Sequence, residues 1–171
     1  MRSVETASLS PGYEISRVIK GCWQLAGDHG AVDRAEAVRN MEAFLVAVIT
    51  ASDCADIYTG VEEMIGEFIA DIRNRRGASV AHRVRVHTKL VPDLSRLHDL
   101  RREEVVAIID RSLKRLRVDR LDLVQFFWWD LALGDAVEAL SVLMDLRAEG
   151  KIRHLGVTNW DSGEIAPFLD A

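Results

Sequence analysis

The sequence predicts a single-domain α/β fold, residues 1–171, in which strands and helices alternate along the chain. Short apolar runs alternate with longer segments of helical periodicity, and no linker, low-complexity tract or close repeat interrupts them. With 171 residues, of which 49% are hydrophobic, the chain is long enough for one good core. This pattern is typical of βαβ units that share one parallel sheet.

Five short apolar runs are expected to form the strands: residues 17–22, 49–53, 84–88, 121–127 and 152–157. The first helix begins after a capping residue, Asp33, and the second begins near Val61. A third helix lies before residue 117, and a fourth ends at Gly150, which is expected to be a left-handed cap. The fifth helix begins after Asp161 or Ser162. The fourth is expected to bury its apolar residues, Val137, Leu140, Leu143, Met144 and Leu146.

Composition and charge exclude several classes of protein. The net charge of −5 argues against nucleic acid as a partner, since nucleic-acid surfaces carry clustered cations. Residues 1–12 contain no apolar signal sequence, and no run reaches the roughly 18 apolar residues of a membrane span. Cys22 and Cys54 are expected to be reduced, partly buried thiols of a cytoplasmic protein, with a disulfide between neighbouring strands as the alternative. No metal-ligand spacing occurs, so no metal is expected.

Polar residues follow two neighbouring strands in a pattern that suits proton transfer. Asp53 ends the second strand, Tyr58 follows five residues later, and Lys89 ends the third strand. A lysine cation stabilises a phenolate, and a carboxylate fixes and neutralises the lysine. We therefore expect the Tyr58 hydroxyl to lie roughly 2.7–3.2 Å from the Lys89 amine, or one water away. His87 shares the face of Lys89 and is either a hydrogen-bonded interior histidine, which is favoured, or a group that tunes the lysine.

The extended motif Asp53-Cys54-Ala55-Asp56-Ile57-Tyr58, with Glu62-Glu63, Gly66, Thr88-Lys89 and Gly150-Lys151-Ile152-Arg153, resembles the aldo-keto reductases. This family reduces carbonyls with NADPH on a (β/α)8 TIM barrel. The resemblance covers essentially the whole chain and implies a partial barrel of about five βα units, since a complete barrel needs roughly 250 residues. It assigns three of the family's four catalytic residues to this chain: Asp53, Tyr58 and Lys89.

The same resemblance implies further site residues. Thr158 and Asn159 match the pair that holds the nicotinamide carboxamide, although two polar residues after a strand are also a routine turn. Trp23 and Trp128 would border the cleft for a small carbonyl-type substrate, with core or rim packing as the alternative for the tryptophans. Position 127, where the family places its catalytic His, is Phe127. Two more departures are Val48, at a usual glycine position, and Ser52, at a usually large apolar position.

Two classes of function follow from this comparison. The first is an NADPH-dependent carbonyl oxidoreductase whose barrel is completed by a partner chain. The second is a diverged non-reductase that uses the cleft for cofactor-independent acid/base chemistry, for ligand binding or as a scaffold. The resemblance implies that the pocket for the adenosine end of NADPH comes from units that this sequence lacks, so we expect this chain alone to bind NADPH weakly or not at all. Because five strands cannot close a barrel, we also expect a homo-oligomer that covers the open side.

Overall fold

The structure is a computed structural model that describes residues 4–27 and 30–169. Its centre is a parallel sheet in the order β3-β4-β5-β6-β7, so strands that follow one another along the chain are neighbours. The predicted α/β class and the five strand–helix units are therefore confirmed. The strands are β3 (Ile19–Gly21), β4 (Ala51–Asp53), β5 (Arg85–Leu90), β6 (Leu121–Phe126) and β7 (Ile152–Val157).

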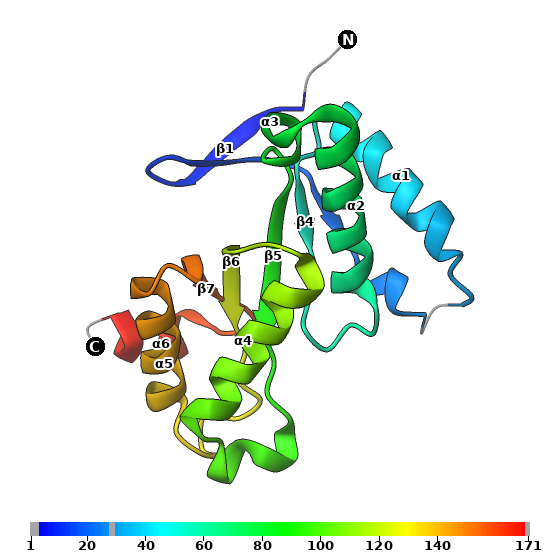
Figure 1. Ribbon diagram of the computed structural model, residues 1–171. Coiled ribbons are helices and arrows are strands. Elements are labelled where there is room, and N and C mark those ends of the chain that lie inside the picture. Colours follow the sequence, from blue (N-terminus) through cyan, green and yellow to red (C-terminus); the bar gives the residue numbers. More distant parts are fainter. Residues whose placement is uncertain (1–3, 28–29, 170–171) are drawn as a thin grey trace.

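Figure 1 shows the longer helices following one another around one side of this sheet. They are α1 (Arg34–Val46), α2 (Val61–Arg76), α4 (Arg102–Leu116) and α5 (Ala136–Ala148), with the shorter α3 (Ala78–Ala81) and α6 (Ser162–Leu169). Two 3₁₀ turns, η1 (Trp23–Ala26) and η2 (Leu94–Asp99), lie in the loops after β3 and β5. No helix among residues 4–27 and 30–169 is both long and apolar enough to cross a membrane.

The helix ends follow from local hydrogen bonding. Asp33 caps α1, since its side chain accepts from the Glu36 amide at 2.9 Å. Gly150 has φ 87° after α5, and its amide donates to the Arg147 carbonyl at 3.0 Å. The predicted left-handed cap is therefore confirmed.

A hairpin precedes the sheet and was not predicted from the polar N-terminal sequence. Strands β1 (Thr6–Ser10) and β2 (Tyr13–Ser16) pair antiparallel across a Pro11-Gly12 turn in which Gly12 has φ 73°. Proline followed by a left-handed glycine is the residue pair of a type II turn, and this signal was available in the sequence. Tyr13 is 1% exposed and packs with Ile15 and Ala51, so the hairpin covers one end of the sheet.

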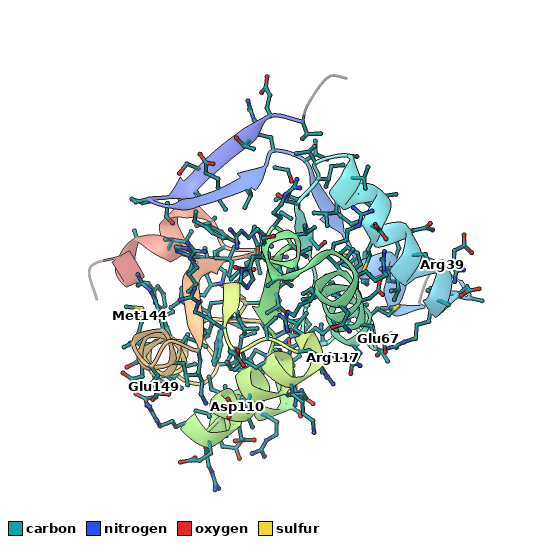
Figure 2. All side chains as sticks on the ribbon, turned by 45° about the horizontal axis from the view of Figure 1, so that its top comes forward. Arg39, Glu67, Asp110, Arg117, Met144 and Glu149 are labelled. Atoms are coloured by element: carbon teal, nitrogen blue, oxygen red, sulfur yellow. The ribbon has the colours of Figure 1, made fainter. Side chains whose placement is uncertain are left out.

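Helix α5 is less buried than its sequence predicted. Leu143 and Leu146 lie in the core, but Val137 is 54% exposed and Met144 is 49% exposed. Figure 2 shows Met144 at the edge of the molecule, near the labelled Glu149. Glu138, Ser141 and Asp145 leave only a narrow polar stripe on α5, and apolar residues cover most of the wider remainder, so periodicity could not identify which of them face the sheet.

The two edge strands leave apolar side chains in partial contact with solvent. Ile19 on β3 is 41% exposed and Val157 on β7 is 39% exposed. Self-association that covers these exposed edges stays a prediction. Light scattering at tens of micromolar would test whether the chain forms a dimer or larger oligomer.

Val48 stores backbone strain at the end of α1. It has φ 66°, and the amides around it make the bonds of a Schellman cap: Val48 N to Leu45 O at 3.1 Å and Ile49 N to Phe44 O at 2.9 Å. A β-branched residue is disfavoured in this left-handed conformation, whereas glycine is not. Val48 thus has the backbone conformation that suits the glycine usual at this position.

The Val48→Gly variant should therefore be more stable than the parent chain. We expect its free energy of unfolding, measured by urea denaturation, to rise by about 1 kcal/mol. The matched control is Val46→Gly, at the exposed last residue of the same helix, which should lower stability by about half a kcal/mol or less because glycine is the poorer helix former. Equal losses in both variants would contradict the strain.

Candidate active site

Three neighbouring strands bring their polar side chains together at the edge where they end. Asp53 is the last residue of β4, Lys89 is the fifth residue of β5, and Gln125 lies opposite Lys89 on β6. The Lys89 Nζ atom donates to Asp53 Oδ1 at 2.6 Å and to the Cys54 carbonyl at 2.7 Å. Asp53 Oδ2 accepts from Gln125 Nε2 at 2.8 Å. The sequence predicted the first of these contacts but not Gln125, although strand register could have indicated it.

The Asp53–Lys89 ion pair is only partly open to solvent. The Lys89 side chain is 13% exposed and that of Asp53 is 34% exposed. An ammonium so far removed from water requires a counter-charge and acceptors, and these two neighbours supply both. The arrangement fixes a cation at the strand ends.

Tyr58 lies beside this cation. The Lys89 Nζ atom is 5.4 Å from the centroid of the Tyr58 ring, within cation–π range. Within the described part of the chain, the ammonium donates to Asp53 and Cys54 and makes no hydrogen bond to the Tyr58 hydroxyl. The three predicted catalytic residues therefore lie together, but the direct bond from the ammonium to the Tyr58 hydroxyl is absent, and Asp53 and the Cys54 carbonyl accept two of the three ammonium protons. The alternative expectation, a contact through one water, stays a prediction.

A buried polar cluster holds the loop that carries Tyr58. Asp56 is 5% exposed; its Oδ1 atom accepts from the Val91 amide at 3.0 Å, and its Oδ2 atom lies 3.4 Å from Arg111. Burial raises the pKa of the Asp56 carboxyl to about 6. These contacts fasten the loop after β4 to the loop after β5 and to α4.

Arg115 provides the second attachment of the same loop. Its guanidinium donates to the Asp56 carbonyl at 2.8 Å and lies 3.4 Å from Glu62, which is 0% exposed and accepts from Thr88 at 2.7 Å. Helices α2 and α4 pack closely at this point. A Cβ atom added to Gly66 of α2 would lie only 2.2 Å from the Arg115 carbonyl oxygen of α4. Neither arginine was identified from the sequence, since nothing local marks a residue that is far away along the chain.

The aromatic residues after β6 point to opposite sides. Trp128, proposed as a substrate-binding residue, is only 5% exposed, packs on Phe126 and donates from its indole to the Leu133 carbonyl at 2.9 Å. It is therefore a core residue in this structure. Trp129 is 47% exposed, and its ring packs edge to face on that of Phe127 with 4.8 Å between the ring centroids. Alternation along the strand groups Trp128 with buried Phe126, and it could have indicated that Trp129 forms the rim.

The remaining predicted site residues lie at the ends of the outer strands. Trp23 begins the turn after β3 and is 49% exposed. Thr158 and Asn159 follow β7; the Thr158 hydroxyl lies 3.1 Å from Asn159 Oδ1, and Asn159 has φ 62°. The Thr158 amide donates to the Phe126 carbonyl at 3.2 Å, so the pair lies beside the end of β6 and is partly open to solvent.

His87 is an interior histidine. It is 4% exposed, its Nε2 atom lies 3.0 Å from the Tyr13 hydroxyl, and burial lowers its pKa. The favoured interpretation of a hydrogen-bonded interior residue is thus confirmed, and the residue helps to hold the hairpin against the sheet.

Cys22 and Cys54 are free thiols that are more deeply buried than predicted, at 1% and 0% exposure. Burial raises the pKa of both thiols. Among residues 4–27 and 30–169, no group of three His, Cys, Asp or Glu side chains is placed to hold a metal ion.

Comparison with known proteins extends over almost the whole chain. The sequence profile of the aldo/keto reductase family matches residues 17–168. Aldo-keto reductase YhdN of Bacillus subtilis is 30% identical over 166 residues, covering 95% of this chain and 49% of the relative. A 6-dehydroglucose reductase of Novosphingobium aromaticivorans is 33% identical, covering 91% of this chain and 51% of the relative. The chain thus spans about half the length of these curated relatives.

Solved structures show the same arrangement. An aldo-keto reductase from Klebsiella pneumoniae, in complex with NADPH, aligns with a TM-score of 0.77 at 25% identity, covering 99% of this chain and 55% of that one. An aldo-keto reductase from Bombyx mori, in complex with NADP, aligns with a TM-score of 0.79 at 23% identity, covering 99% and 55%. The predicted partial (β/α)8 barrel is therefore confirmed.

The raised pKa of Asp56 makes a prediction about stability. A carboxyl with a pKa of about 6 in the folded state and 3.8 in the unfolded state binds its proton more tightly when folded, so its contribution to stability grows as the pH falls. Relative to Asp56→Asn, the parent chain should gain about 1 kcal/mol between about pH 7 and about pH 5. Urea unfolding at several pH values measures this difference. The exposed control Asp119→Asn should show no such trend, and a flat difference for Asp56→Asn would contradict the assignment.

Proposed function

Because the chain belongs to the aldo/keto reductase family, we propose that it carries the proton-donating half of an NADPH-dependent carbonyl reductase. The observation that supports this most is the 2.6 Å Asp53–Lys89 pair at the ends of adjacent strands, with the Tyr58 ring beside it. The substrate is a small molecule with an aldehyde or ketone group. A partner chain supplies the strands that complete the barrel.

In this proposal the Tyr58 hydroxyl gives its proton to the carbonyl oxygen of the substrate. The Lys89 ammonium stabilises the phenolate that remains, because a cation nearby favours the charged form of a phenol. Asp53 holds that ammonium in place and balances its charge. The buried cluster around Asp56 keeps the Tyr58 loop from moving away.

The chain also has groups that fit the nicotinamide end of NADPH. Thr158 and Asn159 present a hydroxyl and an amide side by side after β7, and Asn159 is exposed. Such groups hydrogen-bond a carboxamide well, since both can donate and accept. When bound, NADPH supplies a hydride to the carbonyl carbon.

Phe127 favours a second candidate function. Its ring has no hydrogen-bond donor for a carbonyl oxygen, at the position where the family places a histidine. A protein that lost this donor can still use Tyr58 and Lys89 for acid/base chemistry without a cofactor. The two functions differ in whether turnover requires NADPH.

Tyr58→Phe tests the proton donor. With NADPH and a small aldehyde, we expect the rate of NADPH oxidation to fall by about two to four orders of magnitude, because phenylalanine has no proton to give. The neighbouring variant Thr59→Val, at an exposed position in the same loop, serves as the control and should retain the rate. Undiminished turnover in Tyr58→Phe would rule out this role.

Phe127→His tests which of the two functions applies. If the chain is a reductase, an imidazole at this position should raise the NADPH-dependent kcat by about tenfold or more, because it can donate to the carbonyl oxygen. Phe127→Leu keeps the position apolar and should give no increase. Turnover that is independent of NADPH and unaffected by Phe127→His would support the second function instead.

A further inference from the structure

We propose that Gln125 is a positioning residue: it fixes the Asp53 carboxylate so that this carboxylate directs the Lys89 ammonium toward Tyr58. The link to proton transfer rests on the proposed reductase function, whereas the positioning itself does not. Gln125 lies in β6, two strands away from Asp53, and its side chain reaches across β5 to make the 2.8 Å bond.

The two oxygens of the Asp53 carboxylate have different partners. Oδ1 accepts from Lys89 at 2.6 Å, and Oδ2 accepts from Gln125 at 2.8 Å. A carboxylate with both oxygens engaged cannot rotate about its terminal bond without breaking a hydrogen bond. The position of the ammonium therefore depends on the amide as well as on the ion pair.

Glutamine suits this task because its amide donates a hydrogen bond without adding charge. An arginine or lysine at the same position would compete with Lys89 for the carboxylate, and an apolar residue would leave Oδ2 without this donor. Lys89 lies directly opposite Gln125 in the β5–β6 register, so the three side chains form one cluster across three strands.

The positioning role of Gln125 is more important in this chain, which has phenylalanine at position 127, than it would be in a chain with the family's histidine there. Phe127 lies two residues beyond Gln125 and shares its side of the strand, but it has no polar atom in its side chain. Within the described residues, the hydrogen bond from β6 to the Asp53–Lys89 pair comes from Gln125. The contribution of β6 to the electrostatics of the site thus passes through this amide.

The test follows the ammonium protons of Lys89 by ¹⁵N-resolved NMR at mildly acidic pH. Lys89 is one of four lysines, and Lys20, Lys114 and Lys151 serve as internal references. In Gln125→Leu, loss of one hydrogen bond should speed the exchange of the Lys89 ammonium protons with water by about tenfold. Gln125→Asn, whose amide is one methylene shorter, should show the same direction of change. The control Leu123→Met, on the same strand and face, should leave the exchange unchanged.

Unchanged Lys89 exchange in a folded Gln125→Leu or Gln125→Asn protein would overturn the proposal. So would an equal acceleration in Leu123→Met, because the effect would then reflect general loosening of the strand. If Gln125→Leu fails to fold, Gln125→Asn decides. With NADPH and an aldehyde, kcat should fall by about tenfold in Gln125→Leu while KM stays unchanged. If the protein with its barrel completed shows no turnover with NADPH and an aldehyde, the proposed function is rejected, and the ammonium exchange still decides the role of Gln125.

Discussion

The ion pair between Asp53 and Lys89 is the contact on which the site depends. It joins the ends of β4 and β5, and its ammonium is largely removed from water. A lysine in that position is tolerable only with a carboxylate and a carbonyl close by, and those acceptors in turn fix where the cation lies. The other features of the site either hold this pair or are held beside it.

The loop that carries Tyr58 needs its own attachment, because no strand or helix contains it. Asp56 and Glu62 supply buried carboxylates, while Arg111 and Arg115 reach them from α4. Buried ion pairs contribute little net stability compared with apolar packing, yet losing one partner is strongly destabilising. Such a cluster favours one conformation of this loop, as the proposed role of Tyr58 requires.

The sequence predicted the parts of the molecule that local patterns determine. Alternating apolar runs and helical segments predicted five parallel strands, and Gly150 and Asp33 predicted helix ends that the structure contains. The hairpin was missed although Pro11-Gly12 is a turn signal, because β1 is mostly polar and exposed and neither strand contains a run of apolar residues. Val137 and Met144 were misjudged because α5 is apolar on several faces.

The candidate site was predictable only in part. Asp53, Tyr58 and Lys89 follow strand ends, so topology brings them together, and a family resemblance pointed to them. Gln125 reaches across β5 to Asp53, and Arg115 reaches the Tyr58 loop from α4. Only the tertiary structure shows these partners. Trp128 was assigned to the cleft by resemblance, whereas strand alternation places it in the core.

A double-mutant cycle between Asp53 and Lys89 tests the central claim most directly. The free energy of unfolding is measured for the parent chain, Asp53→Asn, Lys89→Met and the double variant. If the pair organises the site, the two substitutions should be coupled by about 1 kcal/mol or more, a value kept modest because Asp53 is partly exposed. Additive effects of the two substitutions would contradict the account.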